Sequence, residues 1–593
     1  MNFLKNILKN VLSNIIAFFI SIIVIFIIFS VVLTIISTSN NQNEVVQVKS
    51  NSLLVIDDIN IIGDRDLISD ELNLDIGISI PGINDELNKE KISIKTFQTL
   101  IDSAKNDENI KGIYLNIDQA SIPFNKLKQV RTILSSFKEI KPIFSYSDFH
   151  TKSAYYLSSI SDFLSVSPPG FISISGFGIF DFFYKELFDE LGVKIELFRV
   201  GEFKGAAETY VRNDFSEENK QQYLEFLEER FNHYLEDISN SRKIERNSLL
   251  NMIDNYETEL LNDALNNNLV DSIIYSDQFD EFLRLKVDSL FNEISILDYK
   301  KTIKTKRKYS KDKIAILYAL GGILPGEGED GIFSETIIED IKKIKKNKNI
   351  KSVIIYVNSG GGSAFASDLI HREIDLLQKE KPVIVYMSDV CASGGYYIAM
   401  PADTLISSKH SIVGSIGVFG IVPDLSGLVN NKLKINIDEI RTNENIGEIN
   451  LFKGLNSKEK VLIQKGVNKI YDDFLEVVSK GRKMSKENVN ELARGRVYYG
   501  NTGKNKNLVD VIGNINDAIN IAAKKANVEK FQIVEYPKQK SSIEKLISSL
   551  SKTSYIFDDY IPQVDNWLIK IITKGHVYDP IQMRMEYQVD DLK

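Results

Sequence analysis

The chain has 593 residues, more than a single domain ordinarily holds. Its 43% hydrophobic and 26% charged residues are typical of a globular protein, and its net charge of -9 gives no overall attraction to nucleic acid. The single cysteine excludes a disulfide within the chain and a metal site built from several cysteines.

A charge-free segment near the N-terminus predicts a membrane anchor. Residues 15–37, IIAFFISIIVIFIIFSVVLTIIS, are 23 residues long, enough to cross a hydrocarbon core of roughly 30 Å. Lys5 and Lys9 precede this span and the next basic residue is Lys49, so the positive-inside rule leaves the N-terminus in the cytoplasm. The alternative, a secretory signal, has a shorter apolar region and an Ala-x-Ala exit that this sequence lacks. We therefore expect residues 1–44 to be a cytoplasmic tip and a single-pass anchor in the cytoplasmic (inner) membrane, with the remainder on the periplasmic or extracytoplasmic side.

The remainder of the chain repeats itself at an offset of 240 residues. NIKGIYLNID (109–118) resembles NIKSVIIYVN (349–358), and the stretch 141–167 lies over 381–407 in the same register. A period this long indicates a duplicated domain rather than an array of short units. The sequence predicts the following segments: a first repeat at 45–300, a basic linker at 301–312, a second repeat at 313–540, and a C-terminal extension at 541–593 that has no counterpart.

Both copies show strands that alternate with helices. In the second copy, short β-branched runs at 314–320, 352–358 and 382–388 predict buried strands, and helical patterns at 334–347 and 367–380 lie between them. A longer charged helix is expected in each copy, at 216–239 and 456–479. This alternation predicts an α/β fold with two tandem β-α repeat domains and parallel sheets.

The copies differ at two loops that follow consecutive strands. VNSGGGSAFASD (357–368) has three adjacent glycines, whereas its counterpart IDQASIPFNKL (117–127) has none. Glycines let backbone N–H groups approach a ligand oxygen closely. In DVCASGGYYIAMPAD (389–403), Ser393 precedes two glycines. The equivalent residue of the first copy, Ser153, is followed by Ala and Tyr instead. The second copy therefore keeps an exposed serine beside an oxyanion-type loop.

Two kinds of residue could serve as the base for such a serine. His410 lies near these loops in sequence and could complete a Ser-His arrangement. A lysine serves equally if burial or a nearby cation lowers its pKa. Lys204 in RVGEFKGAAE (199–208) falls opposite an isoleucine of RTNENIGEIN (441–450), so the first copy keeps a lysine where the second keeps the serine.

At this point the chain resembles a known family, signal peptide peptidase A or protease IV, in its long duplicated form. The resemblance extends from the anchor to about residue 530. It rests on the Asn-Ser-x-Gly-Gly loop at 358–362, Ala-Ser-Gly-Gly-Tyr at 392–396, Gly-Ser-Ile-Gly-Val at 414–418, and GRVYYGNTGKNKNLVD at 495–510.

The resemblance implies a Clp/crotonase-like α/β fold, a homotetramer and a Ser/Lys dyad divided between the repeats. Carried onto this sequence, it implies Ser393 as the nucleophile and Lys204 as the general base. Ser415 stands where the family has a serine bonded to that lysine, and the backbone N–H groups of Gly361 and Gly394 would form the oxyanion hole. Gly360 departs from the family, which usually has proline there. Cys391 stands where relatives often have a small residue, and we interpret it as a buried apolar side chain.

The expected function is that of a membrane-anchored serine endopeptidase that degrades cleaved signal peptides and other apolar peptides. No phosphate-loop or metal-spacing pattern occurs in the sequence, so neither a cofactor nor a metal is expected. Two alternatives stay open. A crotonase-type acyl-CoA enzyme would share the fold, although it would act in the cytoplasm, and an inactive scaffold would match the degenerate first copy.

Overall fold

The computed structural model describes residues 46–67, 90–303, 310–443, 445, 449–539 and 581–584, together with positions 20 and 23. The predicted membrane span at 15–37 lies outside the described residues, apart from those two positions. Within the described ranges, no helix is both long enough and apolar enough to cross a membrane. The C-terminal extension at 541–593 is described only at 581–584.

A parallel sheet forms the centre of the first repeat. Its strands lie in the order β8, β6, β5, β4, β1, β9, and all neighbouring pairs are parallel. Helices cover such a sheet, which explains why its strands are rich in Ile, Leu and Phe. The strands are β1 (Ser52–Ile56), β4 (Ile110–Leu115), β5 (Ile143–Ser147), β6 (Phe163–Val166), β8 (Ser272–Ile273) and β9 (Asn292–Ser295).

The sheet of the second repeat has the same strand order. Strands β20, β16, β15, β13, β10 and β21 take the places of β8, β6, β5, β4, β1 and β9, again in parallel pairs. Strand β4 begins at Ile110 and β13 begins at Ile350, 240 residues later, which confirms the predicted register of the duplication. The strands, with two additions at one edge, are β10 (Lys313–Leu320), β13 (Ile350–Ser359), β15 (Val383–Ala392), β16 (Thr404–Ser407), β17 (Ile412–Gly414), β19 (Val497–Tyr499), β20 (Val511–Ile512) and β21 (Gln532–Tyr536).

Helices of the two repeats also correspond. The helices of the first repeat are α3 (Ile94–Asn106), α4 (Phe124–Lys138), α5 (Lys152–Ser158), α6 (Lys185–Leu191), α7 (Glu208–Val211), α8 (Glu217–Arg242), α9 (Arg246–Asp254), α10 (Leu261–Asn266), α11 (Ser276–Lys286) and α12 (Ile296–Thr302). Those of the second are α13 (Ser334–Lys346), α14 (Ala364–Gln378), α15 (Gly394–Ala399), α16 (Ser457–Arg482), α17 (Lys486–Leu492), α18 (Gly500–Asn505) and α19 (Ile515–Lys525). The long helices α8 and α16 both end at a lysine in the left-handed region, Lys243 (φ 56°) and Lys483 (φ 53°).

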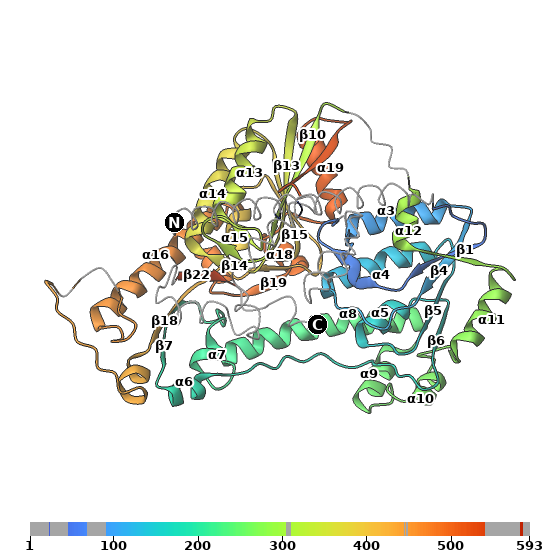
Figure 1. The fold of residues 1–593 in the computed structure, drawn as a ribbon, viewed down its shortest axis with the longest axis horizontal. Helices are drawn as coiled ribbons and strands as arrows, with labels where there is room; N and C mark the ends of the chain where they lie inside the picture. Colours follow the sequence, from blue (N-terminus) through green and yellow to red (C-terminus); the bar gives the residue numbers. More distant parts are fainter. Residues whose placement is uncertain are drawn as a thin grey trace, which may run out of the picture.

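A third sheet joins the two repeats. Its order is β12 (Ile332–Phe333), β11 (Ile323–Leu324), β14 (Gly361–Ser363), β22 (Ile581–Arg584), β18 (Val418–Asp424) and β7 (Lys194–Val200). Strand β7 belongs to the first repeat, yet it pairs antiparallel with β18 along its whole length, with Val200 opposite Val418 and Lys194 opposite Asp424. Figure 1 shows β7 beside β18, on the far side of the second repeat from the sheet that contains β1 and β4. The chain of the first repeat therefore reaches across the second repeat.

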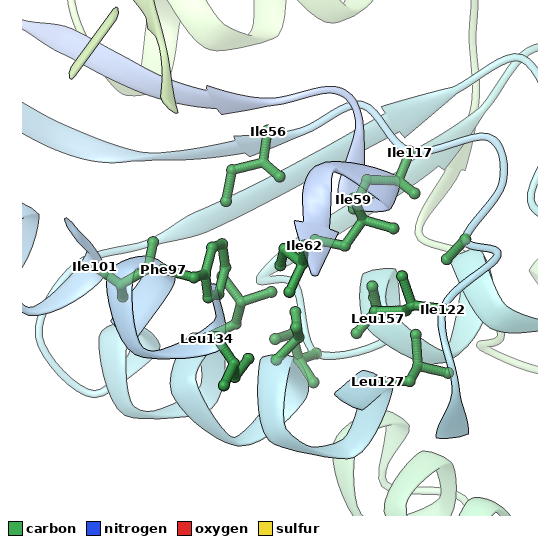
Figure 2. Packing of buried hydrophobic residues seen from close by; sticks show 14 of the residues in the cluster. Ile56, Ile59, Ile62, Phe97, Ile101, Ile117, Ile122, Leu127, Leu134 and Leu157 are labelled. Atoms are coloured by element: carbon green, nitrogen blue, oxygen red, sulfur yellow. The ribbon is translucent and has the colours of Figure 1, made fainter. Parts of the chain in front are cut away.

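The core of the first repeat fixes the helix that faces the second. In Figure 2, Ile56 of β1 points toward the helix layer, where Phe97 and Ile101 of α3 and Leu134 of α4 pack together. Leu127 of α4 is also buried in this cluster. Helix α4 is thereby held with its first turn toward the second repeat.

The apolar core is continuous between the repeats. The cluster that contains Ile56 and Phe97 also includes Ile314, Tyr356 and Tyr386 of the second repeat, all of which are buried. Burial of apolar surface at this boundary stabilises one arrangement of the two repeats.

Candidate active site

Ser393 lies at the junction between strand β15 and helix α15. Its backbone has φ 54° and ψ -119°, a conformation that a residue with a side chain rarely adopts. Such a conformation costs on the order of 1–3 kcal/mol and persists only where the surrounding structure holds it. The Ser393 N–H donates to the Gly414 carbonyl oxygen at 2.8 Å. The side chain is fully buried, so the prediction of an exposed serine is wrong for this structure. The sharp turn therefore fixes the hydroxyl at the end of the strand.

Lys204 reaches this hydroxyl from the first repeat. Val200 of β7 pairs with Val418 of β18, so the residues just after β7 lie beside the residues just before β18. Lys204 follows β7 and Ser415 precedes β18. The Lys204 Nζ lies 2.8 Å from Ser393 Oγ, 2.9 Å from Ser415 Oγ and 3.3 Å from the Ser415 carbonyl oxygen. The structure thus brings three residues singled out in the sequence together within one chain.

The loop that carries Lys204 is held against the second repeat. The Phe203 N–H donates to the Arg494 carbonyl oxygen at 3.0 Å, and Arg199 Nη1 donates to the Lys204 carbonyl oxygen at 3.3 Å. A Cβ on Gly495 would lie 2.5 Å from Lys204 N and 2.8 Å from Lys204 Cβ, so only glycine fits there. Gly495 is not among the site residues predicted from the sequence. Its place at the head of the motif at 495–510 was the available signal.

The lysine itself is buried. Its exposed fraction is 2%, and those of Ser393 and Ser415 are 0% and 2%. Burial disfavours the charged form of an amine. Proton exchange between this amine and the Ser393 hydroxyl needs no rearrangement, because the two groups are already within hydrogen-bonding distance.

The two predicted oxyanion glycines are neighbours. A Cβ on Gly361 would lie 2.6 Å from Gly394 N, so the two backbones pack against each other at a position with no room for a side chain. Gly361 has φ 96° at the start of β14, and Gly394 is the first residue of α15. The Gly361 N–H donates to Ser359 Oγ at 3.1 Å. A ligand oxygen would therefore compete with the Ser359 hydroxyl for this donor.

The structure also places Cys391, which was predicted to be a buried apolar side chain, and His410, which was the alternative base. Cys391 is fully buried, its thiol contacts the Gly395 carbonyl oxygen at 3.4 Å, and burial raises its pKa, which disfavours a thiolate. The ring of His410 packs against His233 at 4.7 Å and Phe124 at 5.5 Å between centroids. Burial, and then the neighbouring His233, lowers the pKa of His410 to about 3.

A buried charge cluster connects the first repeat to both strands of the candidate site. Lys126 of α4 forms ion pairs with Asp64, at 2.9 Å, and with Asp389 of β15. Asn358, at the end of β13, donates to the same two carboxylates at 2.9 and 3.2 Å and accepts from the Val390 N–H at 3.1 Å. Because β13 leads into the glycine loop and β15 leads into Ser393, this cluster holds both loops. None of its three charged residues is among those predicted from the sequence.

The cluster favours a charged lysine. Burial alone would lower the pKa of Lys126, but the charges of Asp389 and Asp64 raise it above its usual value. Burial raises the pKa of Asp64 and Lys126 lowers it, with a net decrease. For Asp389, burial outweighs Lys126 and the pKa is raised. Removing the Lys126 ammonium group would therefore leave a buried Asp389 carboxylate without a cation, and its ionised form would be unfavourable.

Comparison with known families identifies both repeats. Residues 135–288 and 375–529 each match Peptidase family S49. The chain is 35% identical over 470 residues to Protease 4 of Haemophilus influenzae, covering 74% of this chain and 75% of that protein. It is 30% identical over 545 residues to the chloroplastic serine protease SPPA of Arabidopsis thaliana, covering 88% and 76%.

Among solved structures, a ClpP1 mutant of Listeria monocytogenes aligns with a TM-score of 0.23 and 17% identity. The alignment covers 34% of this chain and 94% of that one.

The charge cluster gives a prediction about stability. We expect Lys126→Ala to lower the free energy of unfolding by about 3–5 kcal/mol, the usual cost of leaving a buried carboxylate without its cation. Urea unfolding followed by circular dichroism measures this change. The matched control is Lys469→Ala, which removes an exposed ion pair with Asp473 on α16 and should change stability little. Equal effects of the two substitutions would contradict a structural role for the cluster.

Proposed function

This chain belongs to peptidase family S49, and on that premise we propose that it is a membrane-anchored serine endopeptidase with a Ser393/Lys204 dyad. The observation that carries the proposal is the 2.8 Å contact between Lys204 Nζ and Ser393 Oγ in a buried site beside two glycine backbones. Family membership and relatives named as proteases support the peptidase activity. The roles of individual residues, the anchor and the substrate are parts of the proposal, as is a Clp/crotonase-like fold.

The proposed reaction is acyl transfer to serine followed by hydrolysis. Neutral Lys204 accepts the Ser393 proton as Oγ attacks a peptide carbonyl carbon. The N–H groups of Gly361 and Gly394 stabilise the oxyanion, and Lys204 then protonates the departing amine. Water, deprotonated by the same lysine, hydrolyses the acyl-enzyme. Ser415 positions the amine, because its hydroxyl and its carbonyl oxygen both lie within 3.3 Å of Nζ.

We further propose that the substrates are apolar peptides, including the remnants of cleaved signal sequences, at the outer face of the cytoplasmic membrane. The charge-free span at 15–37 and its flanking lysines support this location. The substrate class rests on the resemblance to signal peptide peptidases. The implied homotetramer stays a prediction that light scattering on the purified protein would test.

Substitution of the nucleophile gives the most direct prediction. Ser393→Ala should abolish hydrolysis of a fluorogenic peptide, while circular dichroism and the melting temperature stay close to wild type, because only a hydroxyl is removed. Cys391→Ala should keep most activity, since the thiol is buried and its pKa is raised. Ser153→Ala should have no effect, because its loop lacks the glycines. An inactive Cys391→Ala enzyme together with an active Ser393→Ala enzyme would reverse the assignment.

Substitution of the base gives a second prediction. Lys204→Ala should lower kcat/KM by roughly 10⁴-fold or more, as for members of other catalytic triads. Lys204→Arg should fail as well, because guanidinium stays protonated. The wild-type kcat/KM should rise with pH and level off once the amine is neutral.

Mixing variants distinguishes a site within one chain from a site shared between chains. The contact between Lys204 and Ser393 joins residues of the same chain. Ser393→Ala and Lys204→Ala subunits mixed before assembly should therefore remain inactive. A fully active Lys204→Ala enzyme would contradict the proposed dyad and favour His410 as the base.

The proposed topology predicts accessibility from outside the cell membrane. Protease added to intact spheroplasts should digest the part of the chain that follows residue 45, because the flanking charges leave only the N-terminus in the cytoplasm. Immunoblotting with an antibody against the second repeat measures the loss, and a cytoplasmic protein serves as the control. Complete protection of the chain in intact spheroplasts would reverse the orientation.

A further inference from the structure

The residues that lead into strand β19 hold a serine that contacts the Lys204 amine. Val497, the first residue of β19, is the register partner of Gly414 at the end of β17. One residue earlier, the Arg496 carbonyl oxygen accepts the Ser415 N–H at 2.8 Å. Ser415 has φ 50°, a conformation that a residue with a side chain rarely adopts, so this bond helps to hold it. The backbone of Arg496 therefore fixes the residue whose hydroxyl and carbonyl oxygen both contact Lys204 Nζ.

The side chain of Arg496 reaches the segment that carries the amine, residues 201–207 between β7 and α7, which we call the Lys204 loop. The guanidinium carbon lies 5.1 Å from the centre of the Phe203 ring, and Phe203 directly precedes Lys204. The ring attracts a cation over its face at this distance. One arginine therefore contacts Ser415 through its backbone and the Lys204 loop through its side chain.

Helix α8 of the first repeat runs past β19 and holds this arginine (Figure 1). Glu225 Oε2 lies 2.6 Å from Arg496 Nη2, in an ion pair between the two repeats. Gln222, on the preceding turn of the helix, accepts the Val497 N–H at 3.1 Å. Residues three apart lie on the same face of a helix. One face of α8 therefore binds both the side chain of Arg496 and the backbone of the residue that follows it.

Two further arginine–glutamate pairs lie at the Lys204 loop, at 3.2 and 3.1 Å: Arg199–Glu208 and Arg494–Glu202. Arg199 also donates to the Lys204 carbonyl oxygen, so it holds the loop from within the first repeat. In the hydrogen bonds of the described residues, neither of these pairs reaches Ser415, whereas Arg496 accepts its N–H. The Arg496–Glu225 pair therefore connects the loop to the serine that orients the amine.

We propose that Arg496 is a positioning residue for the Lys204 amine and that the ion pair with Glu225 keeps Arg496 in place. The inference rests on the proposed peptidase function and deepens it, because it names a residue that acts on the general base through Ser415 and Phe203. A base speeds a reaction only while it is held in reach of its proton donor, and a displacement of about 1 Å can cost on the order of 10²-fold in rate.

Kinetics of the full-length protein test the proposal. Arg496→Met keeps the aliphatic stem but loses the charge that binds the Phe203 ring and Glu225. It should lower kcat by about tenfold or more and leave KM within about twofold, because the residue positions the base and does not bind the peptide. Arg496→Lys keeps the charge and should recover most of this loss. Glu225→Gln should lower kcat by about two- to fivefold, since a half-exposed ion pair contributes less.

The pH profile distinguishes positioning from a general loss of active protein. In Arg496→Met the amine is more hydrated and has lost a neighbouring cation, and both changes favour its protonated form. The midpoint of the rise of kcat/KM with pH should therefore move to higher pH, whereas a smaller fraction of folded enzyme would leave the midpoint unchanged. A wild-type kcat or an unmoved midpoint in Arg496→Met would overturn the proposal.

A double-mutant cycle tests the contact with the loop. Phe203→Leu removes the ring but stays apolar, so it should lower kcat as Arg496→Met does. The double variant should be no slower than the slower single variant, because both substitutions remove the same contact. Fully additive losses would overturn the proposal. The matched control is Arg372→Met, which removes an exposed ion pair with Asp375 on α14 and should change neither kcat nor the pH midpoint.

Hydrogen exchange separates failure of this inference from failure of the proposed catalysis. Mass spectrometry follows exchange in segments 199–208 and 411–418 of proteins that also carry Ser393→Ala, so turnover has no influence. Arg496→Met should speed exchange several-fold in both segments, and Arg496→Lys and Arg372→Met should leave it unchanged. These results hold even if no variant hydrolyses peptides, in which case the peptidase proposal alone fails. Unchanged exchange in either segment, or faster exchange spread equally over the whole chain, would overturn the positioning role.

Discussion

The antiparallel pairing of β7 with β18 is the constraint on which the candidate site depends. It inserts a strand of the first repeat at the edge of a sheet in the second, with Val200 opposite Val418. Lys204 follows one of these strands and Ser415 precedes the other, so the pairing itself brings the amine to the serines. Neither repeat contains both residues. The two repeats therefore form one candidate site, to which the first contributes the lysine and the second contributes the serines.

The cluster around Lys126 reinforces this arrangement from the other side of the second repeat. Lysines 126 and 204 are both buried at a boundary between the repeats, but their partners differ. Carboxylates surround Lys126 and stabilise its ammonium form. The hydrogen bonds of Lys204 to Ser393 and Ser415 are made to two hydroxyl groups and a carbonyl oxygen, which carry no full charge. The same residue type thus serves as a structural cation in one place and as a candidate base in the other.

Features with a local or repeated signal could be predicted from the sequence. The strands at 352–358 and 382–388, the helices at 216–239 and 456–479, and the 240-residue register follow from apolar periodicity and self-similarity, and the structure contains all of them. The third sheet, Gly495 and the Asp64–Lys126–Asp389 cluster were not predicted. Each depends on segments far apart in the chain, such as Lys204 N beside Gly495, and no periodic pattern encodes such a contact.

The distance along the chain between the two halves of the site has a consequence for synthesis. Lys204 and Ser393 are separated by 189 residues, and Lys204 is positioned by a strand pairing with residues 418–424. Contacts of such long range form late, because the entropy of closing the loop must be overcome first. A growing chain that ends before residue 424 lacks the partner for β7. The lysine and the serine therefore meet only when both repeats have been synthesised and have packed together, so a partly made chain carries an incomplete candidate site.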